Sequence, residues 1–193
     1  MRLDVLNRGY RPGTKVLFAV IRLSSGHPVP DAARLVFYRP DFYGTLAKQF
    51  THEAMRGPSA WSVADRELMA AYVSQVNDSA FCIGAHSATA RQAGQDGPKV
   101  AAVLADLESA PVEDGLRATL RMLGQLTREG QVSAEDMGQV LAAGVSRDQV
   151  QDALAVCAAF STTNRLADAF GFEVLSREGF DAGAKFLLKR GYR

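Results

Sequence analysis

Apolar residues recur every three to four positions along nearly the whole chain, and few segments alternate apolar and polar residues as strands do. This spacing is typical of amphipathic helices, so the pattern predicts an all-α fold. Proline, glycine and capping residues divide the pattern into segments. The predicted helices cover residues 14–23, 30–38, 41–56, 62–76, 79–94, 100–108, 112–128, 134–143, 147–170 and 176–190.

Several helix ends are marked by residues that cap helices. Two of the predicted helices begin with a Ser-x-x-Asp pattern, whose side chains can bond the free N–H groups of a first turn. The markers are Ser62 with Asp65, Ser133 with Asp136, Ser146 before the longest helix, and Gly171 after it. No repeat, low-complexity tract or obvious linker interrupts these segments, so we expect one domain over residues 1–193.

The dipeptide Asn77–Asp78 breaks the helical pattern near the middle of the chain. Its side chains can cap the helix that follows. Because a connection this short joins antiparallel neighbours, the segments 62–76 and 79–94 are predicted to form a helix hairpin.

Composition narrows the class of protein. The chain of 193 residues has 47% apolar residues, a net charge of +1 and no block of like charge, which argues against a nucleic-acid partner. No apolar run approaches the ~20 residues of a membrane-spanning helix, and the early run 16–21 lacks the cleavage site of a signal peptide. Two cysteines 75 positions apart make no disulfide framework, so the cytoplasm is the expected compartment.

Candidate chemistry is concentrated in the predicted hairpin. Ser79, Cys82 and His86 stand at positions i, i+3 and i+7, so they share one face of the second helix. Glu67 lies ten residues before the turn and His86 about eight after it, which brings the two roughly level in an antiparallel pair. The spacing therefore predicts that a thiol, an imidazole and a carboxylate converge between the helices.

This arrangement can activate a thiol. Cys82 falls in the first turn of its helix, where the positive end of the dipole favours an anion by ~0.3–1 kcal/mol. That effect alone is too small to make a strongly acidic thiol, but His86 can take the proton and Glu67 can orient the imidazole. Ser79 can cap the helix or donate a hydrogen bond to the thiolate.

The segment from Arg39 to Arg91 resembles the alkylhydroperoxidase D and carboxymuconolactone decarboxylase superfamily, and within it the uncharacterised peroxidase-related branch. The spacing follows the motif Glu-x11-Cys-x2-Cys-x3-His, with serine in place of the first cysteine. The similar stretches are 55–59 (MRGPS), 62–68 (Ser-x-x-Asp-Arg-Glu-Leu), 73–77 (Val-Ser-x-Val-Asn), 159–160 (AF) and 164–171 (Asn-Arg-Leu-Ala-Asp-Ala-x-Gly). The resemblance implies an AhpD-like helical bundle with a core at about 39–94.

The resemblance also implies roles for the hairpin residues. Cys82 matches the peroxidatic cysteine, and Glu67 with His86 matches the proton relay. Ser79 occupies the place of the resolving cysteine and cannot form its disulfide, while Phe81 stands where some members carry a second histidine. The implied partners are a hydroperoxide or another small molecule, and a thiol or dithiol reductant. No cofactor or metal is implied.

Without the first cysteine of the motif, three alternatives remain for the site. Cys82 can act as a one-cysteine peroxidase reduced by an external thiol, Cys157 can resolve it, or the site serves another reaction or none. In the alternative enzyme, His86 and Glu67 transfer protons on a small acid, as in a decarboxylase or isomerase. A catalytically silent family member is the third class.

Several of these residues also have a purely structural or metal-binding interpretation. Free cysteine is often a small buried hydrophobe, and Cys157 lies in a small-residue run typical of helix packing. A zinc ion bound by Cys82, His86 and Glu67 is the metal alternative. The aromatic residues Phe81, Trp61 and Tyr72 are expected in a core or interface. Abundant apolar helix faces, and the resembled family, predict a homo-oligomer: a dimer, trimer or hexamer.

Overall fold

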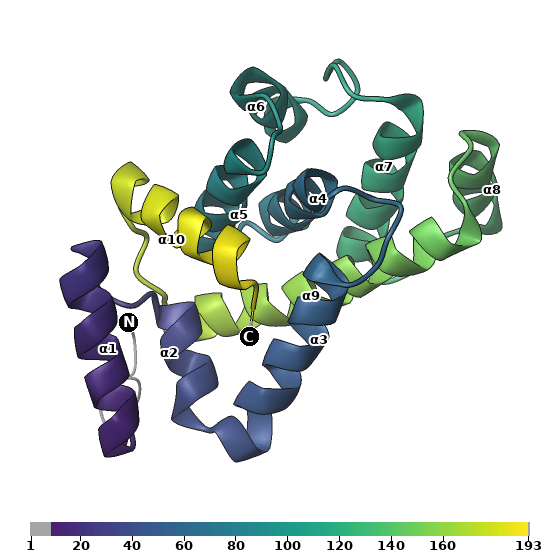
Figure 1. Ribbon diagram of the computed structural model, residues 1–193. Coiled ribbons are helices and arrows are strands. Elements are labelled where there is room, and N and C mark those ends of the chain that lie inside the picture. The colour runs from purple at the N-terminus through teal and green to yellow at the C-terminus, as the bar shows by residue number, and fades with distance from the viewer. Residues whose placement is uncertain (1–8, 193) are drawn as a thin grey trace.

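A computed structural model describes residues 9–192 of the chain (Figure 1). Over this range the fold is entirely helical, with ten α-helices, one π-helical turn and no strand, which confirms the predicted all-α class. The elements are α1 (Pro12–Ser25), α2 (Asp31–Tyr38), η2 (Pro40–Gly44), α3 (Thr45–Arg56), α4 (Val63–Val76), α5 (Ala80–Gln92), α6 (Gly97–Ala105), α7 (Asp114–Glu129), α8 (Ala134–Ala142), α9 (Arg147–Phe170) and α10 (Arg177–Arg190).

Two predicted helices differ from the observed ones. The segment 41–56 is divided, because a π-helical turn precedes α3. The helix expected at 100–108 begins three residues earlier and ends at Ala105. Its first turn contains Pro98, which the sequence pattern placed in a loop. Proline is tolerated in a first turn, because the N–H that it lacks has no partner within the helix there.

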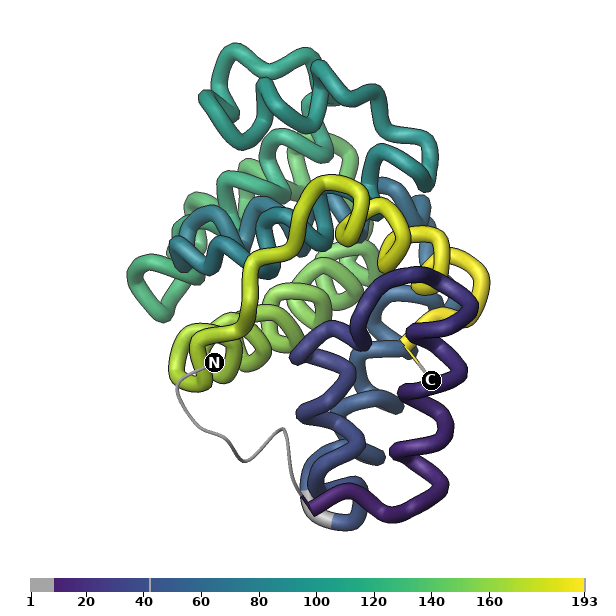
Figure 2. Tube along the Cα trace, turned by 90° about the vertical axis from the view of Figure 1, so that its left-hand side faces the viewer, coloured from purple at the N-terminus to yellow at the C-terminus, as the bar shows by residue number. Residues whose placement is uncertain are grey.

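The predicted hairpin is the centre of the fold. The helices α4 and α5 make the most extensive helix–helix contact in the described chain, α10 packs on α5, and α9 and α7 pack on α4. Asp78 turns the chain between them with a φ of 55°, and the N–H of Ser79 donates to Ser74 O. The N-terminal helices α1–α3 gather at one end of the bundle, opposite α6 and the start of α7 (Figures 1 and 2).

Most predicted caps are confirmed. Ser62 forms a full capping box with Asp65, Ser146 caps α9, and Gly171 ends that helix with a φ of 63°. Ser133 caps α8 by accepting from the N–H of Asp136, but the reciprocal bond of a capping box is replaced by a bond between the two side chains. Asn77 and Asp78 form the turn and do not cap α5, whose N-cap position is Ser79.

Residues of the hairpin take part in two apolar clusters. The larger lies among α4, α7 and α9 and includes the fully buried Leu68, Leu120 and Phe160. The smaller surrounds Cys82, where α5 meets the end of α9 and the approach to α10. Because α4 and α5 are covered on several sides, polar residues on them are forced into the interior, where they need partners. No helix among residues 9–192 is long and apolar enough to cross a membrane.

Candidate active site

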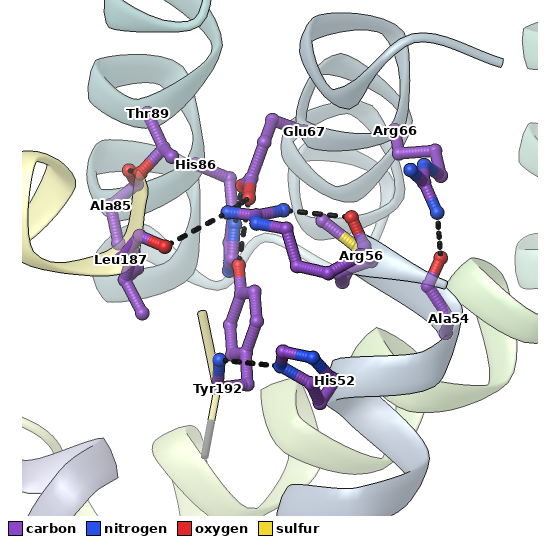
Figure 3. A network of polar contacts seen from close by, with 11 residues as sticks. His52, Ala54, Arg56, Arg66, Glu67, Ala85, His86, Thr89, Leu187 and Tyr192 are labelled. Atoms are coloured by element: carbon purple, nitrogen blue, oxygen red, sulfur yellow. Dashed lines mark hydrogen bonds and ion pairs between the residues drawn. The ribbon is translucent and has the colours of Figure 1, made fainter. Parts of the chain in front are cut away.

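Glu67 and His86 meet inside the hairpin. Glu67 Oε2 lies 2.7 Å from His86 Nδ1, Glu67 is fully buried and His86 is 5% exposed (Figure 3). The carboxylate comes from the first turns of α4 and the imidazole from the middle of α5. The expectation that these positions stand level in an antiparallel pair is confirmed.

Two residues that sequence reasoning missed bind the other carboxylate oxygen. Arg56 Nη2, at the end of α3, donates to Glu67 Oε1 over 2.7 Å, and the Tyr192 hydroxyl, just beyond α10, donates to the same atom over 2.9 Å. Arg56 lay in a stretch noted only for its resemblance to the family. Tyr192 is 125 residues from Glu67, and no spacing rule connects the two.

The charges at this cluster are set by its surroundings. Burial alone would raise the pKa of Glu67, but the hydrogen bond and charge of His86, together with Arg56, outweigh it and lower the pKa below its ordinary value. Burial, followed by the Glu67 charge, holds the pKa of Tyr192 well above 10, so its hydroxyl stays protonated. Glu67 is therefore an anion that accepts every bond it makes, and His86 Nδ1 carries a hydrogen.

Two aromatic side chains lie near the imidazole. Phe160 on α9 meets the His86 ring edge-on, with centroids 4.2 Å apart, and Tyr192 lies nearly parallel to it at 6.5 Å and 18°. Within the described chain, the second ring nitrogen of His86, Nε2, has no hydrogen-bond partner. In the neutral form of the ring with its hydrogen on Nδ1, Nε2 would carry the free lone pair that a general base requires.

Cys82 lies one turn before His86 on α5, but its thiol is not activated at rest. It is 1% exposed in the small apolar cluster, and no hydrogen bond joins it to His86 among the residues that the structure describes. Burial raises the pKa of the Cys82 thiol to about 12, offset in part by a hydrogen bond from Ser79 and increased by the Asp168 charge. Desolvation therefore acts against the small dipole effect expected for the first turn of α5.

Ser79 is the N-cap residue of α5 without acting as a side-chain cap. Its hydroxyl donates over 3.0 Å to Asp168 Oδ1 on α9, and the residue is completely buried. The same hydroxyl is close enough to Cys82 to lower the thiol pKa. The one hydroxyl proton of Ser79 is donated to Asp168, so Ser79 ties α5 to α9, and its role toward a Cys82 thiolate stays a prediction.

Cys157 is a core residue, as the small-residue run predicted. It is 3% exposed in the larger cluster, near Thr127 and Ser161. Cys82 belongs to the smaller cluster, whose member Ala167 lies ten residues further along α9 than Cys157. Both cysteines are free, and a disulfide between them would need Cα atoms within ~7 Å.

The remaining singled-out residues are structural. Phe81 packs edge-on against Phe172 and Phe180 in the small cluster, and Trp61 is buried with its indole N–H bonded to Gln149 O. Asn164 is buried and accepts a hydrogen bond from Ser74. Among residues 9–192, no group of three or more histidine, cysteine or acidic side chains is arranged to hold a metal ion.

The helical architecture matches the AhpD-like fold of solved structures. A crystal structure of an uncharacterized peroxidase-related protein from Silicibacter sp. TM1040 superposes with a TM-score of 0.79 and 22% identity, over 92% of this chain and 93% of that one. A second, an AhpD-core peroxidase-related protein from Ralstonia eutropha JMP134, gives 0.76 and 17%, over 95% of each chain. The TM-scores show that the fold is shared, and at identities this low they show the fold alone.

Residues 40–125 match the model of the carboxymuconolactone decarboxylase family. This segment contains α3, α4 and α5 and therefore the whole Glu67–His86 pair. The resemblance inferred from the hairpin motif is thus confirmed. No curated protein matches the chain. The family match covers this segment, and the likeness to the two solved structures extends over nearly the whole described fold.

Proposed function

We propose that the protein is a peroxidase-related enzyme in which Cys82 reduces a hydroperoxide with the help of Glu67 and His86. The observation that carries the proposal is the 2.7 Å contact between Glu67 and His86, buried one helical turn from the thiol. Side chains at i and i+4 on a helix are neighbours, so His86 Nε2 is within reach of the thiol after a small side-chain movement. The peroxidase-related names of the structural neighbours add support.

The resting thiol is protonated, so its proton must leave as the substrate reacts. His86 Nε2 takes the proton from Cys82, and the thiolate attacks the outer oxygen of the hydroperoxide. The O–O bond breaks, the inner oxygen leaves as an alkoxide, and the protonated His86 returns the proton to it. Cys82 becomes a sulfenic acid and the hydroperoxide becomes an alcohol, while Glu67 stabilises the imidazolium throughout.

Return to the thiol needs an external reductant. Ser79 has no sulfur, and Cys157 is held in the other cluster. One molecule of an external thiol displaces water from the sulfenic acid and forms a mixed disulfide with Cys82. A second thiol attacks that disulfide, releases Cys82 as a thiol and leaves as the oxidised dimer. A dithiol reductant supplies both sulfurs in one molecule.

The test is sulfenic acid formation at Cys82. Protein with the Cys157→Ala change, treated with a few equivalents of an organic hydroperoxide and a sulfenic-acid trap, should show the adduct at Cys82 by mass spectrometry. The His86→Gln change should slow adduct formation by about a hundred-fold, the contribution of a general base. An unmodified Cys82 after prolonged treatment rejects the proposal.

A second candidate is a proton-transfer enzyme that acts on a small acid, such as a decarboxylase or isomerase. Its support is that the Glu67–His86 pair is assembled at rest while the Cys82 thiol is buried, with a pKa of about 12 and no bond to His86. The Cys82→Ser change separates the two candidates, because it abolishes peroxidase turnover and leaves proton transfer active. Absence of both reactions would indicate a silent family member.

We also propose that the chain associates with copies of itself. Exposed apolar side chains on α1 support this, since Val16, Val20 and Leu23 are 63%, 54% and 85% exposed. A dimer, trimer or hexamer is expected by light scattering at micromolar concentration, and a monomer contradicts the proposal. Both cysteines are free thiols, in keeping with the cytoplasm as the proposed compartment.

A further inference from the structure

Tyr192 is placed at the candidate site by a defined turn. Gly191 follows α10 with a φ of 67°, a conformation that favours glycine, and a Cβ there would collide with the His52 ring. The N–H of Tyr192 then donates to His52 Nδ1 on α3 over 3.3 Å. The backbone is thereby pinned to α3, and the side chain enters the space beside Glu67 (Figure 3).

The Tyr192 side chain makes three kinds of contact there. Its hydroxyl donates to Glu67 Oε1, its ring lies nearly parallel to His86, and the Arg56 guanidinium lies over the ring 5.1 Å from its centroid. Arg56 is itself held by the carbonyl of Met55 and, more loosely, by that of Leu187 on α10. The two donors to Oε1 therefore come from α3 and from the segment after α10.

The two oxygens of the Glu67 carboxylate have different hydrogen-bond partners. Oε1 accepts from Tyr192 and Arg56, and Oε2 is left for His86 Nδ1. With one oxygen held from two directions, the carboxylate cannot rotate about its terminal bond without breaking both bonds. A fixed Oε2 keeps the hydrogen on Nδ1 and leaves Nε2 as the basic nitrogen.

We propose that Tyr192, together with Arg56, is a positioning residue that fixes the Nδ1–H tautomer of His86 through Glu67. Tyr192 acts through the carboxylate and not on the substrate. Its catalytic consequence rests on the proposed function, whereas its effect on the tautomer does not. A hydrogen bond to a charged group is worth ~1.5–3 kcal/mol, so a rate that depends on this orientation should fall about ten-fold or more without it.

Nitrogen NMR of the imidazole reads the tautomer directly. The chain has three histidines, so histidine-labelled protein gives a simple spectrum, and the His86→Gln spectrum assigns the signals of His86. In the wild-type protein, Nδ1 should appear protonated and Nε2 unprotonated. The Tyr192→Phe change keeps the ring and removes the hydroxyl, and it should give a mixture of both tautomers.

Two further variants control the experiment. Tyr72→Phe changes a tyrosine on the same helix as Glu67 whose hydroxyl makes no bond to the carboxylate, and it should leave the His86 signals unchanged. Arg56→Lys keeps a cation near Oε1 and should preserve the tautomer better than Arg56→Met. If Tyr192→Phe lowers stability too far for NMR, the Arg56 pair still tests the proposal.

The kinetic readout separates this inference from the proposed function. In Tyr192→Phe, the rate of Cys82 oxidation should fall about ten-fold while the KM for hydroperoxide stays the same. If Tyr192→Phe shifts the tautomer but Cys82 of the wild-type protein does not react with hydroperoxide, the positioning role is supported and the peroxidase proposal is rejected. A single unchanged tautomer in both Tyr192→Phe and Arg56→Met overturns the inference, whatever the activity.

Discussion

The Ser79 hydroxyl, which stands where the resembled motif has its first cysteine, donates a hydrogen bond of 3.0 Å to Asp168 on α9. The position is completely buried. In place of a reactive sulfur, this position therefore has a hydroxyl that links the hairpin to the longest helix, α9. A change at Ser79 is therefore expected to alter packing as well as the surroundings of the neighbouring Cys82.

The Ser79→Cys change should restore an intramolecular disulfide. Residues at i and i+3 in a first helical turn are close enough for their sulfurs to meet, so a sulfenic acid formed at Cys82 would be captured by the new thiol. Treatment with one equivalent of hydroperoxide should remove two thiols per chain in a thiol count and give a mass lower by two hydrogens. The Asp168 bond is lost, at a cost of ~1.5–3 kcal/mol.

The matched control for this change is Ser87→Cys. Ser87 is also on α5 and mostly buried, but it lies five residues after Cys82, or about 140° around the helix. The variant gains a thiol that cannot reach Cys82. A disulfide in the control, or none in Ser79→Cys, contradicts the prediction.

Cys82 should resist alkylation at neutral pH. Its pKa of about 12, compared with the ordinary 9.0, lowers the thiolate fraction about a thousand-fold. In a Cys157→Ala background, iodoacetamide should label the folded protein at least that much more slowly than the protein in 6 M urea. Fast labelling of the folded protein would show that the thiol is activated at rest.

The same raised pKa predicts a loss of stability in alkali. A thiol whose pKa rises on folding contributes fully below its unfolded pKa of about 9.0, and the contribution is lost as the pH rises toward about 12. The free energy of unfolding measured with urea should therefore decline more steeply between pH 9 and 11 in the wild-type protein than in Cys82→Ser. Parallel slopes contradict the assignment.

Glu67→Gln should be strongly destabilising. The change keeps the shape of the side chain but leaves the mostly buried Arg56 guanidinium without its counter-charge, and breaking a buried pair costs ~3–5 kcal/mol. Urea unfolding at pH 7 measures this. Glu129→Gln, at an exposed glutamate at the end of α7, should change stability by less than ~0.5 kcal/mol.

The pH dependence of the Glu67 contribution has the opposite sign to that of Cys82. The pKa of Glu67 is lowered on folding, so its contribution is present above the ordinary value of 4.5 and is lost as the pH falls through the lower folded pKa. The stability difference between the wild-type protein and Glu67→Gln should therefore shrink below pH 4.5. A difference that grows in acid would contradict the charge assigned to Glu67.

Gly84→Ala should weaken the packing of α10 on α5. A Cβ at Gly84 would collide with the Phe180 ring, and such overpacking costs ~1–3 kcal/mol. Gly183→Ala is the control within α10, because nothing lies within 4 Å of the added Cβ. In a helix interior that change should stabilise by ~0.5–1 kcal/mol, and thermal unfolding distinguishes the two.

Local pattern accounts for most of the helices and for the pairing in the hairpin. The apolar period and the caps at Ser62 and Ser146 depend on neighbours within a few residues, so they are readable from sequence. The level positions of Glu67 and His86 follow from the short turn at Asn77–Asp78. Pro98 was placed wrongly, because a first helical turn and a loop both accept proline.

The pKa of the Cys82 thiol could not be predicted from local pattern in the same way. Spacing put Cys82 beside His86 and suggested an activated thiolate, yet the pKa is decided by Phe81, Ala167 and Phe172 closing around the sulfur. Phe81 precedes Cys82 in the sequence, whereas Ala167 and Phe172 come from the end of α9 and the segment just after it. Desolvation depends on how completely they cover the thiol, and no spacing rule measures coverage.

The sequence by itself determined the all-α class, the helix hairpin, and a carboxylate and imidazole that meet inside it. Only the tertiary structure decided what surrounds that pair. Arg56 arrives from the end of α3 and Tyr192 from beyond α10, separated from Glu67 by 11 and 125 residues. Helix spacing is set by hydrogen bonds and packing over a few residues, whereas burial and charge compensation are set by elements that are distant in the sequence and meet only in the folded chain.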